Sequence, residues 1–169
     1  MLRWLKSQGR NLQDIGWNRS TTFPAVILGV VFAFGYSAYT LSNPLIGTNA
    51  TEISLFKLAS VVVSVIGSIV EECVFRGYII SELERINVST ITQILVSGIS
   101  FGIIHIGFDF VGVLLTFIMG IAMATAFVIG KRSLTPSIIS HSIINILVEP
   151  WLLLFIITMY GRLGQMIVR

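Results

Sequence analysis

Hydrophobic residues follow one another along this chain in long runs separated by short polar stretches. The hydrocarbon core of a bilayer is about 30 Å thick, so a straight membrane-spanning helix needs about 20 apolar residues. Such runs predict six membrane segments, at roughly 23–46, 55–80, 90–107, 110–130, 134–149 and 150–161. Two of them are short for a full span and are expected to be tilted, half-inserted or one helix broken at Pro150. The pattern predicts an all-α, polytopic transmembrane helix bundle.

The composition indicates that lipid is the solvent for most of the chain. Of the 169 residues, 54% are hydrophobic and 11% are charged, whereas soluble domains carry roughly 25% charged residues. Cys73 is the only cysteine, which excludes an intrachain disulfide. We find no internal repeat or linker, and we therefore expect one transmembrane domain over residues 23–169.

Residues 1–22 are expected to form a cytoplasmic or interfacial N-terminal segment. Arg3, Lys6, Arg10 and Asp14 interrupt the apolar run that a cleaved signal peptide needs. Apolar side chains interleaved with these cations suggest a short amphipathic helix on the membrane surface, and a solvated tail is the alternative. The first span would then act as the insertion signal.

The charges between the segments predict their orientation. With the N-terminus inside, the inner side collects Arg3, Lys6, Arg10, Arg19, Arg85, Lys131, Arg132, Arg162 and Arg169, and the outer side collects Glu52, Asp109 and Glu149 beside one cation, Lys57. Because loops rich in Lys and Arg stay cytoplasmic, both termini are expected inside. We expect a multi-pass membrane protein with no nucleic-acid partner.

Small residues predict where the helices pack closely. Gly98 and Gly102 stand four residues apart, as do Gly120 and Ala124. Small side chains at this spacing let helix backbones approach each other within lipid. These patterns predict a compact bundle but do not indicate a function.

Charged residues inside the second segment are the first indication of chemistry. Glu71, Glu72 and Arg76 lie near its middle, where a carboxylate costs several kcal/mol unless it is paired. Glu72 and Arg76 are four residues apart on one helical face and can form an ion pair. Glu71 points about 100° away around the helix and has no partner within the segment.

Later segments add polar groups to this set. His105 ends the run Phe101–His105, and His141 and Asn145 project from one helical face. Two histidines, an unpaired glutamate and an asparagine inside apolar helices indicate a reaction site or a translocation pathway. His105 falls nearer the outer end of its segment than the other groups, so convergence would need a helix that starts later or continues past Gly107.

Together these groups are sufficient for peptide hydrolysis. A glutamate in a low-dielectric environment is a competent base toward water and then an acid toward the leaving amine. A histidine bonded to the same water would orient it. A histidine and an asparagine on one face can donate two hydrogen bonds to a single oxygen, which makes an oxyanion hole.

The motifs Glu71–Arg76 (EExxxR), Phe101–His105 (FxxxH) and His141–Asn145 (HxxxN) follow one another in this order. They resemble the CPBP family of intramembrane proteases, which includes type II CAAX prenyl endopeptidases of the Rce1 type and Abi proteins linked to bacteriocin self-immunity. The flanking stretches FRGYI and FGIIHIGFDFVGVL are also similar to that family. The resemblance covers a core of about residues 55–150.

The resemblance implies a role for each residue. Glu71 and His105 would activate the water, His141 and Asn145 would form the oxyanion hole, and Glu72 with Arg76 would support the site. It implies a membrane-associated peptide or protein substrate, including a prenylated CAAX type. The family has been described both as metal-independent and as metal-dependent, and a zinc ion would take Glu71, His105 and His141 as ligands. We favour the form without a cofactor, since the chain has no HExxH motif and no third histidine.

Two other classes of function stay open. A non-catalytic immunity or accessory protein would bind a peptide in the same cleft without cleaving it. An ion-coupled carrier would use the same acidic and histidine groups as a relay. Against a carrier, the chain shows no repeat symmetry and no interrupted helices in matching halves.

Overall fold

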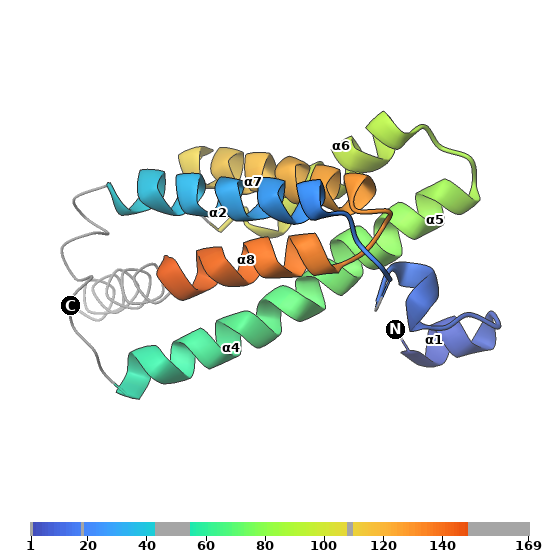
Figure 1. Ribbon diagram of the computed structural model, residues 1–169, viewed down its shortest axis with the longest axis horizontal. Coiled ribbons are helices and arrows are strands. Elements are labelled where there is room, and N and C mark those ends of the chain that lie inside the picture. The colour runs from blue at the N-terminus through green and yellow to red at the C-terminus, as the bar shows by residue number, and fades with distance from the viewer. Residues whose placement is uncertain (1, 18, 43–54, 108–109, 149–169) are drawn as a thin grey trace, which may run out of the picture.

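The chain folds as a bundle of helices (Figure 1). The structure is a computed structural model that describes residues 2–17, 19–42, 55–107 and 110–148. These residues form α1 (Leu2–Ser7), a short 3-10 helix η1 (Leu12–Ile15), α2 (Phe23–Leu41), α4 (Leu55–Glu72), a π-helix η2 (Cys73–Ile79), α5 (Ile80–Arg85), α6 (Thr90–Ile104), α7 (Phe110–Ile129) and α8 (Thr135–Leu147). They contain no strand, so the predicted all-α bundle is confirmed for the described part of the chain.

Among the described residues, three helices are long and apolar enough to cross a membrane: Phe23–Leu41, Leu58–Arg85 and Phe110–Ile129. The second of these runs without a break through α4, η2 and α5, so it extends beyond the predicted end near residue 80. The helices α6 and α8 match the third and fifth predicted segments and are shorter. The sixth predicted segment, 150–161, lies outside the described residues, as does Pro150.

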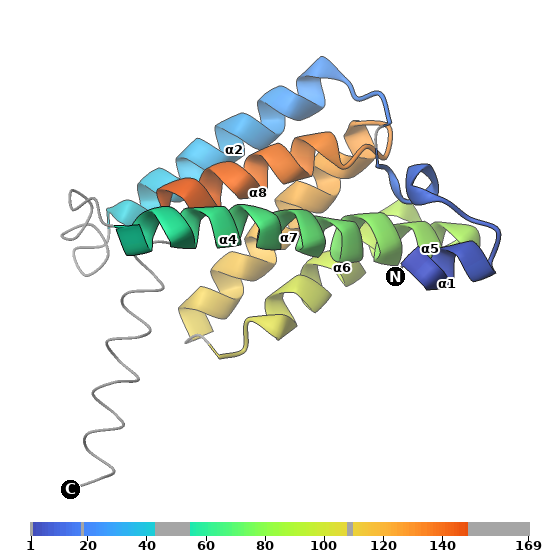
Figure 2. The same cartoon turned by 90° about the horizontal axis from the view of Figure 1, so that it is seen from below.

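The helices α2 and α8 pack parallel to each other on one side of the bundle, and both begin at the same end of it (Figure 1 and Figure 2). Small buried residues recur every four positions along α2, at Ala25, Gly29, Ala33 and Ser37. A Cβ added at Gly29 would lie 3.0 Å from the carbonyl oxygen of Pro136 in α8. This stripe therefore holds the two backbones close together, as small residues do in membrane helices.

The helices α6 and α7 pack against each other through the predicted glycines. A Cβ added at Gly120 would lie 2.9 Å from the Cα of Gly98, and one at Gly102 would lie 3.1 Å from the Cβ of Phe117. Ala124, one turn further along α7, is fully buried. The prediction that these small residues mark close helix packing is confirmed.

The N-terminal segment packs against one end of the bundle. Leu5 and Ile15 are almost completely buried, and the carbonyl oxygen of Gly16 accepts a hydrogen bond from the backbone N–H of Leu134. A Cβ added at Gly77 would lie 2.8 Å from the carbonyl oxygen of Ile15. The alternative of a solvated tail is therefore wrong, because the apolar side chains of this segment have buried positions on α5, η2 and the loop before α8.

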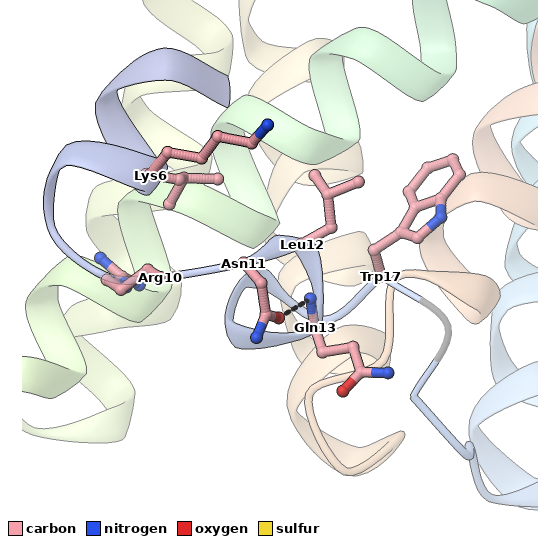
Figure 3. A pocket seen from close by; sticks show the side chains of 7 residues that line it. Lys6, Arg10, Asn11, Leu12, Gln13 and Trp17 are labelled. Carbon is pink, nitrogen blue, oxygen red and sulfur yellow. Dashed lines mark hydrogen bonds between the residues drawn. The ribbon is translucent and has the colours of Figure 1, made fainter.

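An open hollow lies beside this segment (Figure 3). Its walls combine apolar, cationic and amide side chains: Leu5, Lys6, Arg10, Asn11, Leu12, Gln13 and Trp17. The Asn11 side chain accepts a hydrogen bond from the backbone N–H of Gln13, which caps η1. The hollow shares no lining residue with the motifs that indicate chemistry.

Most of the described inner cations gather at this end of the bundle. Arg10 and Arg85 both pair with Glu82, and the Nε of Arg132 lies 2.9 Å from Oε1 of Glu84. The predicted outer anions, Glu52, Asp109 and Glu149, lie outside the described residues. A cytoplasmic location for the N-terminus stays a prediction of the positive-inside rule.

Candidate active site

A stripe of buried polar residues runs along α4 and into η2. Ser60, Ser64, Ser68, Glu72 and Arg76 recur every four positions, and all five are buried. Side chains at this spacing share one face of a helix. The stripe faces the polar residues of α8, where Ser137, His141 and Asn145 are also buried. The two motifs EExxxR and HxxxN therefore meet between α4 and α8.

Glu72 joins two other site residues. Its Oε1 lies 2.9 Å from Nδ1 of His141, and its Oε2 lies 3.2 Å from Nε of Arg76. The side chains of Glu72 and Arg76 are both 0% exposed, so the predicted ion pair is present and fully buried. An ionised carboxylate can only accept, so Nδ1 of His141 carries the hydrogen and a neutral ring keeps its lone pair on Nε2.

Glu71 approaches the other side of the same imidazole. Its Oε2 lies 3.8 Å from Nε2 of His141, which is longer than a direct hydrogen bond. The side chain of Glu71 is 35% exposed, whereas that of Glu72, one residue later, is completely buried. His141 therefore lies between a buried carboxylate that orients it and a more accessible carboxylate. The partner that Glu71 lacks within its own segment comes from α8.

Asn145 uses its amide nitrogen to hold α8 against α4. Its Nδ2 donates to the carbonyl oxygen of Ser64 at 3.1 Å and to Oγ of Ser68 at 3.0 Å. The Ser68 hydroxyl donates in turn to the Ser64 carbonyl at 2.9 Å. In this arrangement Asn145 and His141 do not both direct hydrogen-bond donors at a single position where an oxyanion could bind. For Asn145 to bind an oxyanion, its amide would have to exchange one of these partners for the substrate oxygen.

Ser64 and Ser68 belong to this polar cluster, although none of the three motifs includes them. The signal was nonetheless present, because both lie in the same four-residue series that contains Glu72 and Arg76. A serine series on an apolar helix marks the face that meets other polar groups, since such groups need partners inside a membrane.

His105 joins the site through Phe101. Its ring lies 4.8 Å from the Phe101 ring between centroids, and its Nδ1 donates to the Phe101 carbonyl oxygen at 2.8 Å. The His141 ring lies 5.6 Å from the same Phe101 ring. Both histidines therefore flank one aromatic side chain. The helix α6 spans Thr90–Ile104, so it neither starts later than predicted nor continues past Gly107, and the convergence of His105 with Glu71 stays a prediction.

The π-helix η2 begins directly after Glu72 and contains Arg76. A π-turn inserts an extra residue into the helical register and so rotates the side chains that follow by roughly 100°. Short π segments occur frequently at functional sites. No local pattern in CVFRGYI predicts this feature.

The alternative zinc site is not assembled in this structure. Among the described residues, which include Glu71, His105 and His141, no group of three His, Cys, Asp or Glu side chains lies close enough to hold a metal ion. Glu71 and Glu72 approach His141 from two sides, while His105 is held by Phe101. The donor set therefore does not fit a three-ligand metal site in this arrangement.

The apolar helices and the buried polar cluster define an integral membrane protein with a polar site inside a helical bundle. A family model described as type II CAAX prenyl endopeptidase Rce1-like matches residues 53–147, which is more than half of the chain. The chain belongs to this family of proteases, as the three motifs predict. Neither the comparison with curated proteins nor that with solved structures gives a match.

Proposed function

We propose that the chain is an intramembrane endopeptidase whose nucleophile is a water activated by Glu71. The observation that supports this most directly is the pair of glutamates around His141, with Glu72 buried and Glu71 partly exposed. Its substrates would be membrane-associated peptides or proteins, including prenylated CAAX types. It would act as a multi-pass protein of the bacterial cell membrane with both termini cytoplasmic.

The first step is attack of water on the scissile carbonyl carbon. Glu71 accepts a proton from the water as the new C–O bond forms, and His105 shares and orients that water. Glu71 later delivers the proton to the amine nitrogen as the C–N bond breaks. Water adds across the amide bond to give a carboxylic acid and an amine, which become a carboxylate and an ammonium by proton transfer, and no co-reactant other than water is needed. General acid–base catalysis of this kind contributes about 10²–10⁴-fold to a rate.

The oxyanion that develops on the carbonyl oxygen needs hydrogen-bond donors. Asn145 would supply one by exchanging its bond to Ser68 for the oxyanion, and His141 would supply the other from Nε2 as an imidazolium, since its Nδ1 already donates to Glu72. The Glu72–Arg76 pair holds the His141 ring in place through the 2.9 Å contact to Nδ1. Donors that are oriented before the reaction stabilise the transition state more than donors that must reorganise.

Cleavage by the purified protein tests this proposal. Membrane-anchored peptides, prenylated and unprenylated, are incubated in detergent with wild type, Glu71→Gln, His105→Ala and the matched control Glu84→Gln. We expect Glu71→Gln to lower kcat by about 10²–10⁴-fold. Glu84 is half-exposed and lies at the end of the bundle with Arg132, so Glu84→Gln should retain wild-type cleavage.

The remaining outcomes separate the alternatives. Cleavage that a chelator abolishes and zinc restores would replace the water-only mechanism with the metal-dependent one. If wild type cleaves no peptide while Glu71→Gln and His105→Ala still protect cells in an immunity assay, the chain is a binding protein and the proposal is wrong.

A further inference from the structure

The buried ring of Phe101 contacts several residues of the site at once. It is 0% exposed, and both histidine rings lie within 6 Å of it, at 4.8 Å for His105 and 5.6 Å for His141. The Cζ of Arg76 lies 4.5 Å from the ring centroid, and the Phe75 ring packs edge-on at 5.3 Å. One neutral side chain therefore contacts groups from all three motifs.

The backbone beneath this ring packs closely against α7. A Cβ added at Gly120 would lie 3.2 Å from the Cβ of Phe101 and 2.9 Å from the Cα of Gly98. The carbonyl oxygen of Gly120 also faces Nη2 of Arg76 at 3.4 Å. Helix α7 thus fixes the base of the Phe101 side chain, and η2 fixes its face.

The geometry of the aromatic contacts is electrostatically favourable. The positive guanidinium lies over the ring, where the negative π-face attracts it. The interplanar angle is 81° with His141 and 88° with Phe75, which are edge-to-face arrangements that aromatic pairs prefer. His105 is held by the ring and also by the Phe101 carbonyl, to which its Nδ1 donates. A change in the tilt of either imidazole would break these ring contacts.

We propose that Phe101 is a positioning residue whose ring sets the places and tilts of the His105 and His141 imidazoles relative to each other, while the hydrogen bonds at Nδ1 select which nitrogen faces the substrate. This inference rests on the proposed hydrolysis for its kinetic consequence, but its structural consequence is independent of activity. An aliphatic side chain would fill the space without orienting the rings. The result would be a folded protein with misoriented histidines.

Kinetics provide the first test. Phe101→Leu is compared with Phe127→Leu, a matched control because Phe127 is also 0% exposed but packs in a second apolar cluster with Ala124 and Leu134. We expect Phe101→Leu to lower kcat by about 100-fold with KM nearly unchanged, as a displaced catalytic group does. Phe127→Leu should keep the wild-type kcat. Equal kcat losses in the two variants would overturn the proposal.

Nuclear magnetic resonance of selectively ¹⁵N,¹³C-labelled histidine provides a test without activity. The chain has two histidines, so His105→Gln and His141→Gln assign both signals. In wild type we expect protonated Nδ1 and ring-current-shifted imidazole protons for both. In Phe101→Leu, Nδ1 should stay protonated because its hydrogen-bond partners remain, but both imidazoles should give broadened or doubled signals because their tilt is no longer fixed; in Phe127→Leu the wild-type pattern should persist.

The wild-type spectrum alone can overturn the proposal, even if Phe101→Leu does not fold. If either histidine lacks the ring-current shift, Phe101 does not contact both rings. Wild-type protein that shows the expected spectra but cleaves no peptide would refute the proposed function and leave the positioning role intact.

Discussion

Two networks of glutamate and arginine occupy different surroundings in this molecule. At the end of the bundle, Glu82 pairs with Arg10 and Arg85, and its side chain is 19% exposed. Inside the bundle, Glu72 pairs with Arg76, and neither side chain is exposed. The first network ties the N-terminal segment to α5. The second places a carboxylate against an imidazole.

This difference in exposure indicates which ion pair is not explained by its contribution to stability. An exposed ion pair contributes little, typically below about 1 kcal/mol, and water can satisfy either partner alone. A buried pair pays a large desolvation cost that well-packed apolar residues would avoid. Glu72 and Arg76 are therefore poorly explained by stability, and their contacts with His141 and Phe101 supply the alternative explanation.

The largest expected loss of stability comes from removing one partner of the buried pair. Arg76→Met should destabilise the protein by about 3–5 kcal/mol, because Glu72 is left as an uncompensated buried charge. Reversible unfolding in mixed detergent measures this free energy. The double variant Glu72→Gln with Arg76→Met should recover most of the loss. A single variant no less stable than Glu82→Gln would contradict the contrast between the networks.

An intermediate loss of stability is expected at the contact between α4 and α8. Ser68→Ala removes the acceptor that Asn145 uses and the hydroxyl that bonds the Ser64 carbonyl. Interhelical hydrogen bonds in membrane proteins average about 0.6 kcal/mol and reach about 1.7 kcal/mol, so the free energy of unfolding should fall within that range. Thr125→Val is the control, since the hydrogen bond that the Thr125 hydroxyl donates to the carbonyl oxygen of Ile121 stays within α7. Similar losses in both variants would show that Asn145 does not depend on Ser68.

The smallest loss of stability is expected at the partly exposed network around Glu82. Glu82→Gln should cost about 0.2–1 kcal/mol, and the loss should shrink at high salt because exposed charges are screened. Unfolding at low and high ionic strength measures the difference. A larger, salt-independent loss would mean that the N-terminal segment is integral to the bundle.

The sequence predicts contacts within one helix better than contacts between helices. The spacing of Glu72 and Arg76 along one helix is local, so their ion pair follows from helical geometry. The approach of His141 to Glu72 depends on the register of α8 against α4, which no spacing within one segment encodes. Glycine pairs predict that α6 and α7 approach closely, but not which residues meet. The π-helix η2 also escapes sequence patterns.

The helices of this protein differ greatly in length, and the surrounding bilayer must adapt to them. The helix Leu58–Arg85 has 28 residues and is about 42 Å long, whereas α6 has 15 residues and is about 22 Å long. The first exceeds a hydrocarbon core of about 30 Å and must tilt or project, and the second falls short of it. Thinning of the bilayer next to the shorter helix is one way to relieve such a mismatch. Because His105 caps the end of α6, thinning there would bring the headgroup layer, and the water it holds, toward the residue proposed to share the nucleophile.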